Sequence, residues 1–184
     1  MNWNDHSSLK GEHAFLSASK YHWVNYDGEK LEDVYLSWLA VQKGTELHEL
    51  ASKLIDLRQK LPRSEKSFNL YVNDGIGFKM LTEQTLYYSP NCFGTADAIS
   101  FRDNILRIHD LKTGKTVASM KQLEIYAALF CLEYGKNPNS IDIELRMYQL
   151  DEILVHHPDP EEILYIIEKI KDFDKRIQRL QDKE

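Results

Sequence analysis

Long apolar runs are absent from the sequence. No window of its 184 residues approaches the roughly 18 uninterrupted apolar residues that a membrane-spanning helix requires. The chain opens on the polar stretch Met1-Asn2-Trp3-Asn4 instead of an apolar leader. We therefore expect a protein that neither crosses a membrane nor is secreted.

Cysteine is equally scarce, with 2 in the chain. Cys92 and Cys131 lie far apart in the sequence, so a disulfide framework is not supported. Two thiols also exclude a four-thiolate iron–sulfur cluster within one chain. Such a chain is typical of a reducing compartment, and the expected location is the cytoplasm.

Basic charge is not in excess either. The chain has 23 Lys and Arg against 29 Asp and Glu, which gives a net charge of -6. This balance excludes a generally basic surface, the simplest electrostatic route to nucleic acid. Because 42% of the residues are hydrophobic and 28% are charged, the composition is that of an ordinary globular protein. Any role in nucleic-acid binding must therefore depend on a local site.

What the sequence does contain is an alternation of helical and strand patterns. Helical spacing of apolar residues gives way to β-branched and aromatic runs, and it returns after them. The expected elements are a helical segment over about 1–62, strands near 78–88, 93–101 and 105–112, a helix at 117–134, a strand at 141–147 and a closing helix at about 160–182. The predicted fold class is α/β, in the order α-β-β-β-α-β plus a final helix, with residues 1–184 in a single domain.

Two carboxylates and a lysine stand at neighbouring strand positions between residues 94 and 114. Asp110 and Lys112 leave the same face of a predicted strand, about 7 Å apart along the chain. If the strands that hold Asp97 and Asp110 pair across the turn at residues 103–104, both carboxylates converge on one place, and clustered hard oxygens suit Mg²⁺ or Mn²⁺. The same residues also fit an ordinary ion pair at a strand end.

A competing motif follows directly. Thr113-Gly114-Lys115-Thr116 copies the end of a phosphate-binding P-loop. A P-loop also has a glycine five residues before Gly114, and this chain has His109 there. The absence of this glycine disfavours an NTPase. Lys115 remains a candidate phosphate contact at the mouth of the site.

Four short motifs follow one another in the chain, each on the type of element that its pattern predicts. They are Gly44-Thr45-Glu46-Leu47-His48 on a helix, Gly94-Thr95-Ala96-Asp97 and Asp110-Leu111-Lys112 on strands, and Gln122-Leu123-Glu124-Ile125-Tyr126 on a helix. Together with an early Ser17-Ala18-Ser19, they resemble the motifs of the PD-(D/E)XK nucleases, and within these the RecB-like branch that includes exonucleases of phages and prophages. The resemblance covers residues 17–150 and implies a restriction-endonuclease-like core, with a central mixed β-sheet flanked by helices.

The resemblance also implies a set of metal ligands. His48, Asp97 and Asp110 would hold the metal, with the backbone carbonyl of Leu111 as a further ligand. Glu83 is an additional candidate, because in some relatives an acid on this strand helps to hold a metal. The alternative for His48, taken alone, is a helix-boundary residue with no role in metal binding.

The catalytic lysine that the resemblance implies is Lys112, and the further catalytic residues are Asp97, Asp110, Gln122 and Tyr126. Gln122 and Tyr126 are four residues apart and share a helix face, from which they would reach this lysine or a DNA phosphate. Their alternative is a hydrogen-bonded pair on a helix surface. Residues 105–122 hold 4 basic residues and 1 acid, so Lys115 and Lys121 are candidate DNA contacts.

The activity that this resemblance implies is a Mg²⁺- or Mn²⁺-dependent deoxyribonuclease without an iron–sulfur cluster. We expect an exonuclease that hydrolyses DNA phosphodiester bonds during phage or bacterial recombination or DNA processing, in the cytoplasm of a bacterial or phage-infected cell. DNA is the expected partner, and a homo-oligomer or a recombination or helicase protein would supply unwinding, because the sequence contains no helicase motif. The alternatives are a non-catalytic member of the same fold that binds DNA or protein, and a site-specific endonuclease.

Overall fold

The computed structural model describes residues 5–9, 11 and 14–182. It divides the chain into two compact units, Met1–Thr45 and Glu46–Glu184. The division falls inside helix α1, Gly28–Asp56, and so within the helical segment that the sequence predicts at the start of the chain. No helix in the described residues is both long enough and apolar enough to span a membrane.

The described residues of the first unit form two short 3-10 helices and the first part of α1. The 3-10 helices are η1, Ser7–Leu9, and η2, Ala18–Asn25. Ser17 caps η2, because its side chain accepts a hydrogen bond from the backbone N–H of Ser19. The first serine of the Ser17-Ala18-Ser19 stretch therefore has a capping role.

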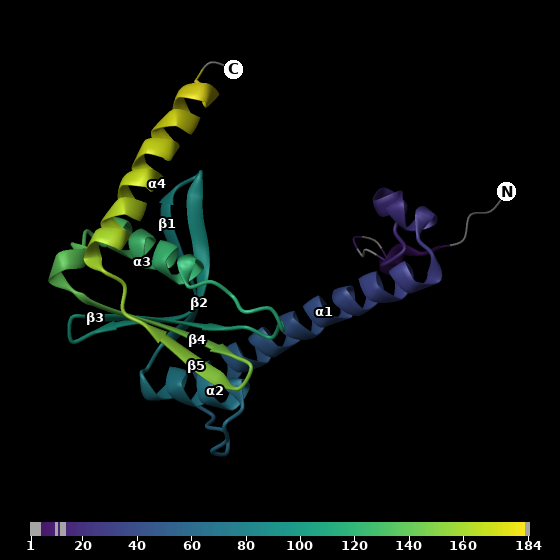
Figure 1. Cartoon of the computed structure of the whole chain (residues 1–184), viewed down its shortest axis with the longest axis horizontal. Helices are drawn as coiled ribbons and strands as arrows, with labels where there is room; N and C mark the ends of the chain where they lie inside the picture. The colour runs from purple at the N-terminus through teal and green to yellow at the C-terminus, as the bar shows by residue number, and fades with distance from the viewer. Residues whose placement is uncertain (1–4, 10, 12–13, 183–184) are drawn as a thin grey trace. The chain divides into compact units, whose positions relative to one another are not determined.

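A five-stranded sheet forms the centre of the second unit (Figure 1). Its strands lie side by side in chain order, and neighbours are antiparallel except β3 and β4, which are parallel. A parallel pair requires a crossover, and helix α3 supplies it. The bounds are Leu81–Ser89 for β1, Cys92–Arg102 for β2, Ile105–Leu111 for β3, Lys121–Glu133 for α3, Asp142–Gln149 for β4 and Glu152–His156 for β5. The mixed sheet of the predicted α/β class is confirmed.

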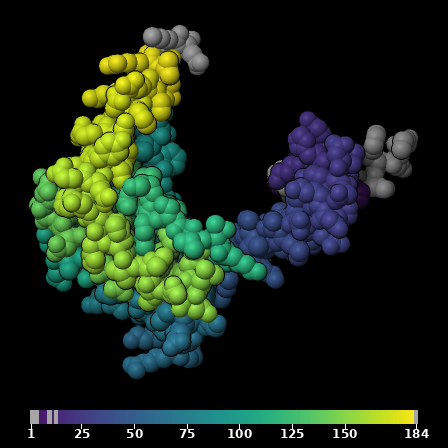
Figure 2. All heavy atoms as spheres, viewed as in Figure 1, coloured from purple at the N-terminus to yellow at the C-terminus, as the bar shows by residue number. Residues whose placement is uncertain are grey.

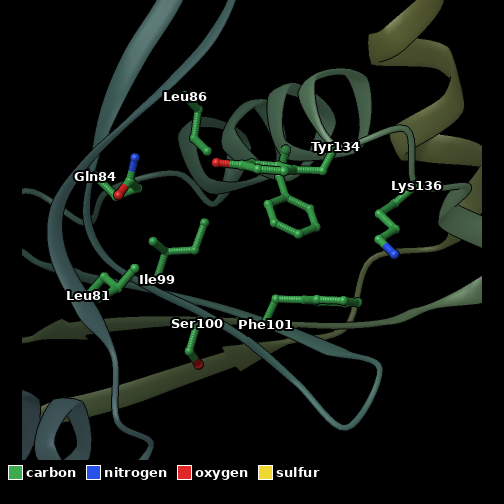
Figure 3. Close-up of a pocket in the computed structure, with 9 residues that line it drawn as sticks. Leu81, Gln84, Leu86, Ile99, Ser100, Phe101, Tyr134 and Lys136 are labelled. Carbon is green, nitrogen blue, oxygen red and sulfur yellow. The ribbon is translucent and has the colours of Figure 1, made fainter.

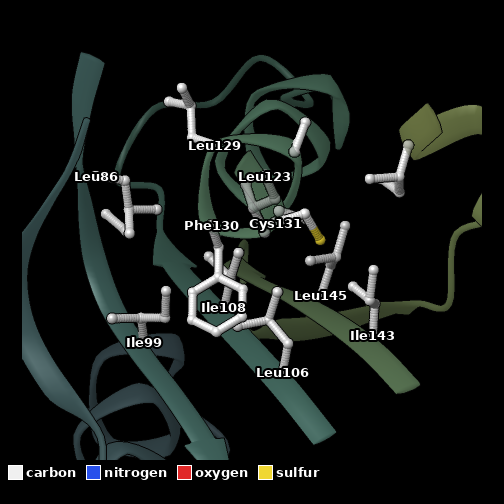
Figure 4. Close-up of a cluster of buried hydrophobic side chains, with 14 of the residues drawn as sticks. Leu86, Ile99, Leu106, Ile108, Leu123, Leu129, Phe130, Cys131, Ile143 and Leu145 are labelled. Carbon is white, nitrogen blue, oxygen red and sulfur yellow. The ribbon is translucent and has the colours of Figure 1, made fainter. Parts of the chain in front are cut away.

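Helices cover both faces of this sheet. Helices α3 and α4, Pro160–Gln181, lie over one face, above a core that includes Leu106, Ile108 and Leu145 (Figure 4). Helix α2, Ser67–Gly77, and the end of α1 lie on the other face, around a second core. Strand alternation supplies both cores from the same strands.

Helix α4 runs beside α3 and beside the tip of the β1–β2 hairpin (Figure 2). Asp174 fixes it to the hairpin, because its Oδ1 accepts hydrogen bonds from Ser89 Oγ at 2.6 Å and from Asn91 Nδ2 at 2.9 Å. Asp159 caps the start of the helix and forms a capping box with Glu162. The closing helix is therefore a packed part of the second unit.

The structure corrects the ends of two predicted helices. Helix α1 ends at Asp56 instead of continuing to Pro62, because Arg58 adopts a φ of 53° and the backbone N–H of Gln59 bonds back to the carbonyl of Leu54. Helix α3 begins at Lys121 instead of residue 117, since residues 114–118 form a loop held by a side chain from β4.

Two elements, α2 and β5, are missing from the predicted order. Two glycines in the 11 residues of α2 weaken its helix signal. Gly75 has a packing role instead, because a Cβ there would lie 2.7 Å from Cδ1 of Ile55 on α1. The residue that lowers helix propensity thus permits the close approach of α1 and α2. Strand β5 has only 5 residues, too few for a clear periodicity.

Candidate functional site

The pairing of β2 with β3 places Asp97 and Asp110 together at one end of the sheet. The register pairs Ala98 with His109, so the two aspartates occupy the next positions on neighbouring strands. Oδ2 of Asp97 accepts a hydrogen bond from the backbone N–H of Leu111 at 3.4 Å. The two carboxylates that the sequence singles out are therefore brought together, and Leu111 lies beside them.

Helix α1 brings His48 to the same carboxylates. Its Nδ1 lies 3.1 Å from Oδ2 of Asp97. The hydrogen bond to Asp97 raises the pKa of His48 above its usual value, against the opposing effect of partial burial. Ala51, one turn later, is fully buried and anchors this part of α1 in the second core. The helix packing thus directs an imidazole at a strand carboxylate.

Asp110 is the most deeply buried acid of the group. Burial raises its pKa to about 6, and repulsion by Asp97 contributes to this rise. Its Oδ1 accepts a hydrogen bond from Nζ of Lys112 at 3.0 Å. Its Oδ2 is also buried and lies 2.9 Å from the same ammonium group. A carboxylate oxygen has two lone pairs, so this contact leaves one for a bound cation.

The lysine is held from its other side by helix α3. Nζ of Lys112 donates to Oε1 of Gln122 at 3.1 Å, and Nε2 of Gln122 donates to the hydroxyl of Tyr126 at 3.2 Å. Gly94 leaves room for the Tyr126 ring, because a Cβ at that position would lie 3.0 Å from its Cε1. The glycine of the second motif and the tyrosine of the fourth are therefore in direct contact.

Glu83 lies beside the same acids on β1. It stands between Thr82 and Gln84, which pair with Ala98 and Ala96, so its neighbour across the strands is Asp97. Burial raises the pKa of Glu83, and the charge of Asp97 adds to this rise. Its φ of 49° is left-handed, a conformation that costs a non-glycine residue on the order of 1–3 kcal/mol. Strained backbone beside an acidic cluster is typical of functional sites.

The comparison with protein families gives one match. Residues 77–149 match the model of a family described as "Protein of unknown function (DUF2800)". No curated protein and no solved structure matches the chain. The matched segment runs from the end of α2 to the end of β4, so it contains Asp97, Asp110 and Lys112 but not His48.

Gln149, a residue that sequence reasoning misses, holds the loop that resembles the end of a P-loop. Nε2 of Gln149 donates to the carbonyls of Gly114 and Thr116, each at 2.7 Å. Lys115 lies between them and is exposed. A glutamine at a strand end carries no signal of a partner some 35 residues away, so no pattern in the sequence reveals this contact.

Tyr71 is a second residue that sequence reasoning misses, because it lies on the unpredicted helix α2. Its side chain is buried, with 3% exposed. Burial raises its pKa, and the charges of Asp97 and Asp110 add to the rise. Tyr71 therefore forms part of the buried wall near the two aspartates.

The basic residues between positions 105 and 122 do not gather at one place. Arg107 alternates with Ile108 on β3, so it leaves the opposite face of the sheet, where it lies 3.2 Å from Glu144. Lys121 pairs with Glu124 on its own helix. Of the two candidate DNA contacts, Lys115 is on the loop that follows β3, whereas Lys121 is engaged with an acid.

A mostly apolar cavity of about 340 Å³ lies between strands β1 and β2 and the end of α3 (Figure 3). Its lining includes Leu81, Ile99 and Tyr134, with Lys136 at the side. No site residue predicted from the sequence is among its described lining residues. The candidate chemistry is therefore not located in this cavity.

Proposed function

We propose that this chain is a divalent-metal-dependent deoxyribonuclease of the PD-(D/E)XK type. The observation that carries the proposal is the group of His48, Asp97, Asp110 and Lys112, which come from one helix and two strands and meet at one end of the sheet. Phosphodiester hydrolysis needs an activated water and positive charge on the phosphate as it reacts. Paired carboxylates beside a lysine are side chains suited to both needs.

The side chains fit a hard divalent cation. The carboxylates of Asp97 and Asp110 and the carbonyl of Leu111 are oxygen ligands that suit Mg²⁺ or Mn²⁺, and the imidazole of His48 favours Mn²⁺. The buried Oδ2 of Asp110 lies 2.9 Å from the Lys112 ammonium group and keeps a second lone pair for a cation, which supports this fit. When bound, such a cation polarises the phosphate and lowers the pKa of an attacking water molecule.

Lys112 is positioned to act on the phosphate. Its side chain is 28% exposed, while Asp110 and Gln122 hold its ammonium group in place. A fixed positive charge at a partly desolvated position stabilises the negative charge that develops on the phosphate. Tyr126 acts through Gln122, because its hydroxyl accepts the hydrogen bond that orients the amide.

The order of elements also supports the proposal. The antiparallel strands β1, β2 and β3 precede α3, and β4 returns parallel to β3. With α1 before them, this is the α-β-β-β-α-β order that the sequence pattern predicts. Of the additional elements, α2 lies between α1 and β1 and β5 follows β4, so neither interrupts the run from β1 to β4.

We propose further that the enzyme acts from DNA ends. The chain has a net charge of -6, and Arg107 and Lys121 are both paired with acids. Few free phosphate contacts predict weak and salt-sensitive capture along a duplex. A free end needs a smaller footprint, and Lys115 on its exposed loop is available to receive a terminal phosphate.

The test is digestion of linear DNA labelled at its ends, with and without Mg²⁺. We expect cleavage by the parent protein in Mg²⁺ and none by Asp110→Ala. Asp142→Asn is the matched control, because this aspartate is exposed at the start of β4 and should leave activity unchanged. A parent protein inactive in both Mg²⁺ and Mn²⁺, or an Asp110→Ala variant as active as the parent, would contradict the nuclease proposal.

Plasmid substrates test the dependence on ends separately. In a time course at fixed Mg²⁺ and moderate salt, the linearised plasmid should be degraded while the closed circular form persists. Equal loss of circular and linear forms would refute the exonuclease proposal and leave the nuclease proposal standing.

A further inference from the structure

A second group of potential metal ligands lies on the other side of α3. Glu124 comes from the first turn of α3, His156 from the end of β5 and Glu162 from the first turn of α4. One ligand atom of each lies within 4.8 Å of those of the other two. Glu124 follows Gln122 by two residues, about 200° around the helix, so it faces away from Lys112.

Two of these side chains carry polar atoms away from water. The carboxylate of Glu124 is only 7% exposed. Nε2 of His156 is buried, and within the described part of the chain it has no hydrogen-bond partner. A neutral imidazole and two carboxylates can present three lone pairs to one place, and such acceptors repel one another unless a cation lies between them.

The spacing suits a small tetrahedral ion. Nε2 of His156 lies 3.4 Å from Oε1 of Glu124. With Zn–N and Zn–O distances of about 2.0–2.2 Å, two ligands of a tetrahedral Zn²⁺ lie about 3.3–3.6 Å apart. This separation is therefore typical of two atoms that share one such ion, although it gives no hydrogen bond in the present arrangement.

In the structure, the carboxylate of Glu124 contacts the positive charge of Lys121. Its ammonium group pairs with the carboxylate of Glu124, while its side chain is 59% exposed. The lysine can withdraw its ammonium group into water, because its side chain is largely exposed and the charge remains hydrated there. A divalent ion would accept lone pairs from His156 and Glu162 as well as from Glu124. In the present arrangement the ammonium group pairs with Glu124, and the carboxylate of Glu162 accepts a hydrogen bond from the backbone N–H of Asp159.

We propose that Glu124, His156 and Glu162 form a second metal site, which binds Zn²⁺ in place of the Lys121 ammonium group. One imidazole and two carboxylates leave a fourth position for water, and the imidazole selects Zn²⁺ over Mg²⁺. The three ligands belong to three elements, so the ion fixes the end of β5 to the first turns of α3 and α4. The site is independent of the proposed nuclease chemistry.

The test is titration of the full chain with Zn²⁺ by calorimetry, in a variant that carries Asp97→Asn and Asp110→Asn so that the candidate nuclease ligands are removed. We expect one Zn²⁺ per chain in this background. Adding His156→Gln or Glu162→Gln should weaken binding at least about tenfold. Co²⁺ in place of Zn²⁺ should give the visible absorption of a four-coordinate ion.

Two further variants make the result specific. His157→Gln is the matched control, because the Nδ1 of His157 lies 3.2 Å from the carbonyl of Ile143, and its Zn²⁺ affinity should equal that of the background. Lys121→Met should bind Zn²⁺ more tightly, since the competing ammonium group is gone. The proposal is overturned by no Zn²⁺ binding in the background, by an unchanged affinity in His156→Gln, by an equal loss in His157→Gln, or by equal or weaker binding in Lys121→Met.

Discussion

Helix α3 separates two clusters, each of which buries a carboxylate beside a lysine that is close to it in the sequence. On one side Lys112 follows Asp110 by two residues, directly after the end of β3, and on the other Lys121 precedes Glu124 by three residues on α3. The lysines differ in their further contacts. Lys112 also donates to Gln122, whereas Lys121 lines a mostly apolar groove along α4.

This difference indicates that similar carboxylate–lysine pairs suit different ligands. In the Asp110 cluster, polar groups continue from the lysine through an amide to a hydroxyl, beside an exposed loop that carries Lys115. In the Glu124 cluster, the ligand atoms come from a strand end and two helix starts that pack together. The first arrangement suits a reacting phosphate, and the second suits an ion that holds elements together.

The largest effect is expected for Lys112→Met. Without the fixed ammonium group, the negative charge that develops on the phosphate loses this stabilisation, and cleavage should fall by about 10²–10³-fold while metal binding persists. Steady-state rates on linear DNA and metal titration by calorimetry measure the two effects. Lys115→Met is the control, with a loss of only a few-fold, because that lysine is exposed and has no role in the buried cluster. Parent-level cleavage by Lys112→Met would show that the lysine has no catalytic role.

The second prediction concerns the stability of the metal-free protein. The pKa of Asp110 is about 6 in the folded state, above the ordinary value of 3.8, so between these pH values the folded protein binds more protons than the unfolded chain. The free energy of unfolding should therefore decrease as the pH rises from about 4 to about 6, by at most about 3 kcal/mol.

Asp110→Asn removes this pH dependence and tests its cause. Urea unfolding with a chelator present should show the variant more stable than the parent above pH 6 and similar to it near pH 4. Asp142→Asn, on an exposed carboxylate, should follow the parent at every pH. A constant difference between Asp110→Asn and the parent across this pH range would contradict the assigned titration.

The Asp110 cluster could be predicted from the sequence to a large extent, because it depends on local patterns. Strand alternation places Asp110 and Lys112 on one face, and the short turn at residues 103–104 brings Asp97 to its neighbour. The three-strand meander could be predicted for the same reason. The sequence shows that Gly94 belongs to a motif. It does not show the contact with the Tyr126 ring, because that contact depends on how α3 packs on β2.

The Glu124 cluster could not be predicted, since its three members are distant in sequence and one belongs to β5, a strand too short to recognise. The role of Lys121 illustrates the same limit. A count of charges between residues 105 and 122 groups it with Lys112, whereas the helix phase turns it toward Glu124 and α4. Contacts between distant elements follow from packing, which no periodicity encodes.

We expect His48→Ala to reduce cleavage less than Lys112→Met does. Loss of one neutral ligand should weaken metal binding and reduce cleavage in Mg²⁺ about tenfold, and Mn²⁺ should restore part of the activity because it binds the remaining ligands more tightly. Rates at saturating Mg²⁺ and Mn²⁺ give the comparison. Glu49→Ala, one residue later on the exposed side of α1, should behave as the parent. Full activity of His48→Ala in Mg²⁺ would show that His48 is a helix-boundary residue and not a metal ligand.

The smallest effect is expected for Gly94→Ala, which tests whether Tyr126 positions the lysine through Gln122. The added Cβ would lie 3.0 Å from Cε1 of Tyr126, so the ring must move by a few tenths of an ångström, and its hydrogen bond with Gln122 weakens. We expect a loss of only a few-fold in kcat with unchanged metal affinity. Gly77→Ala is the control, because no described atom lies within 4 Å of a Cβ there, and it should be neutral or slightly stabilising.

Tyr126→Phe completes the test as a double-mutant cycle with Gly94→Ala. It removes the hydroxyl that accepts the hydrogen bond from Gln122 and should by itself reduce kcat by a similar few-fold factor. If the alanine acts through the ring, the double variant should lose little more than either single variant, because both changes disrupt one contact. Losses that multiply would show that Gly94 affects catalysis by a route other than the Tyr126 ring.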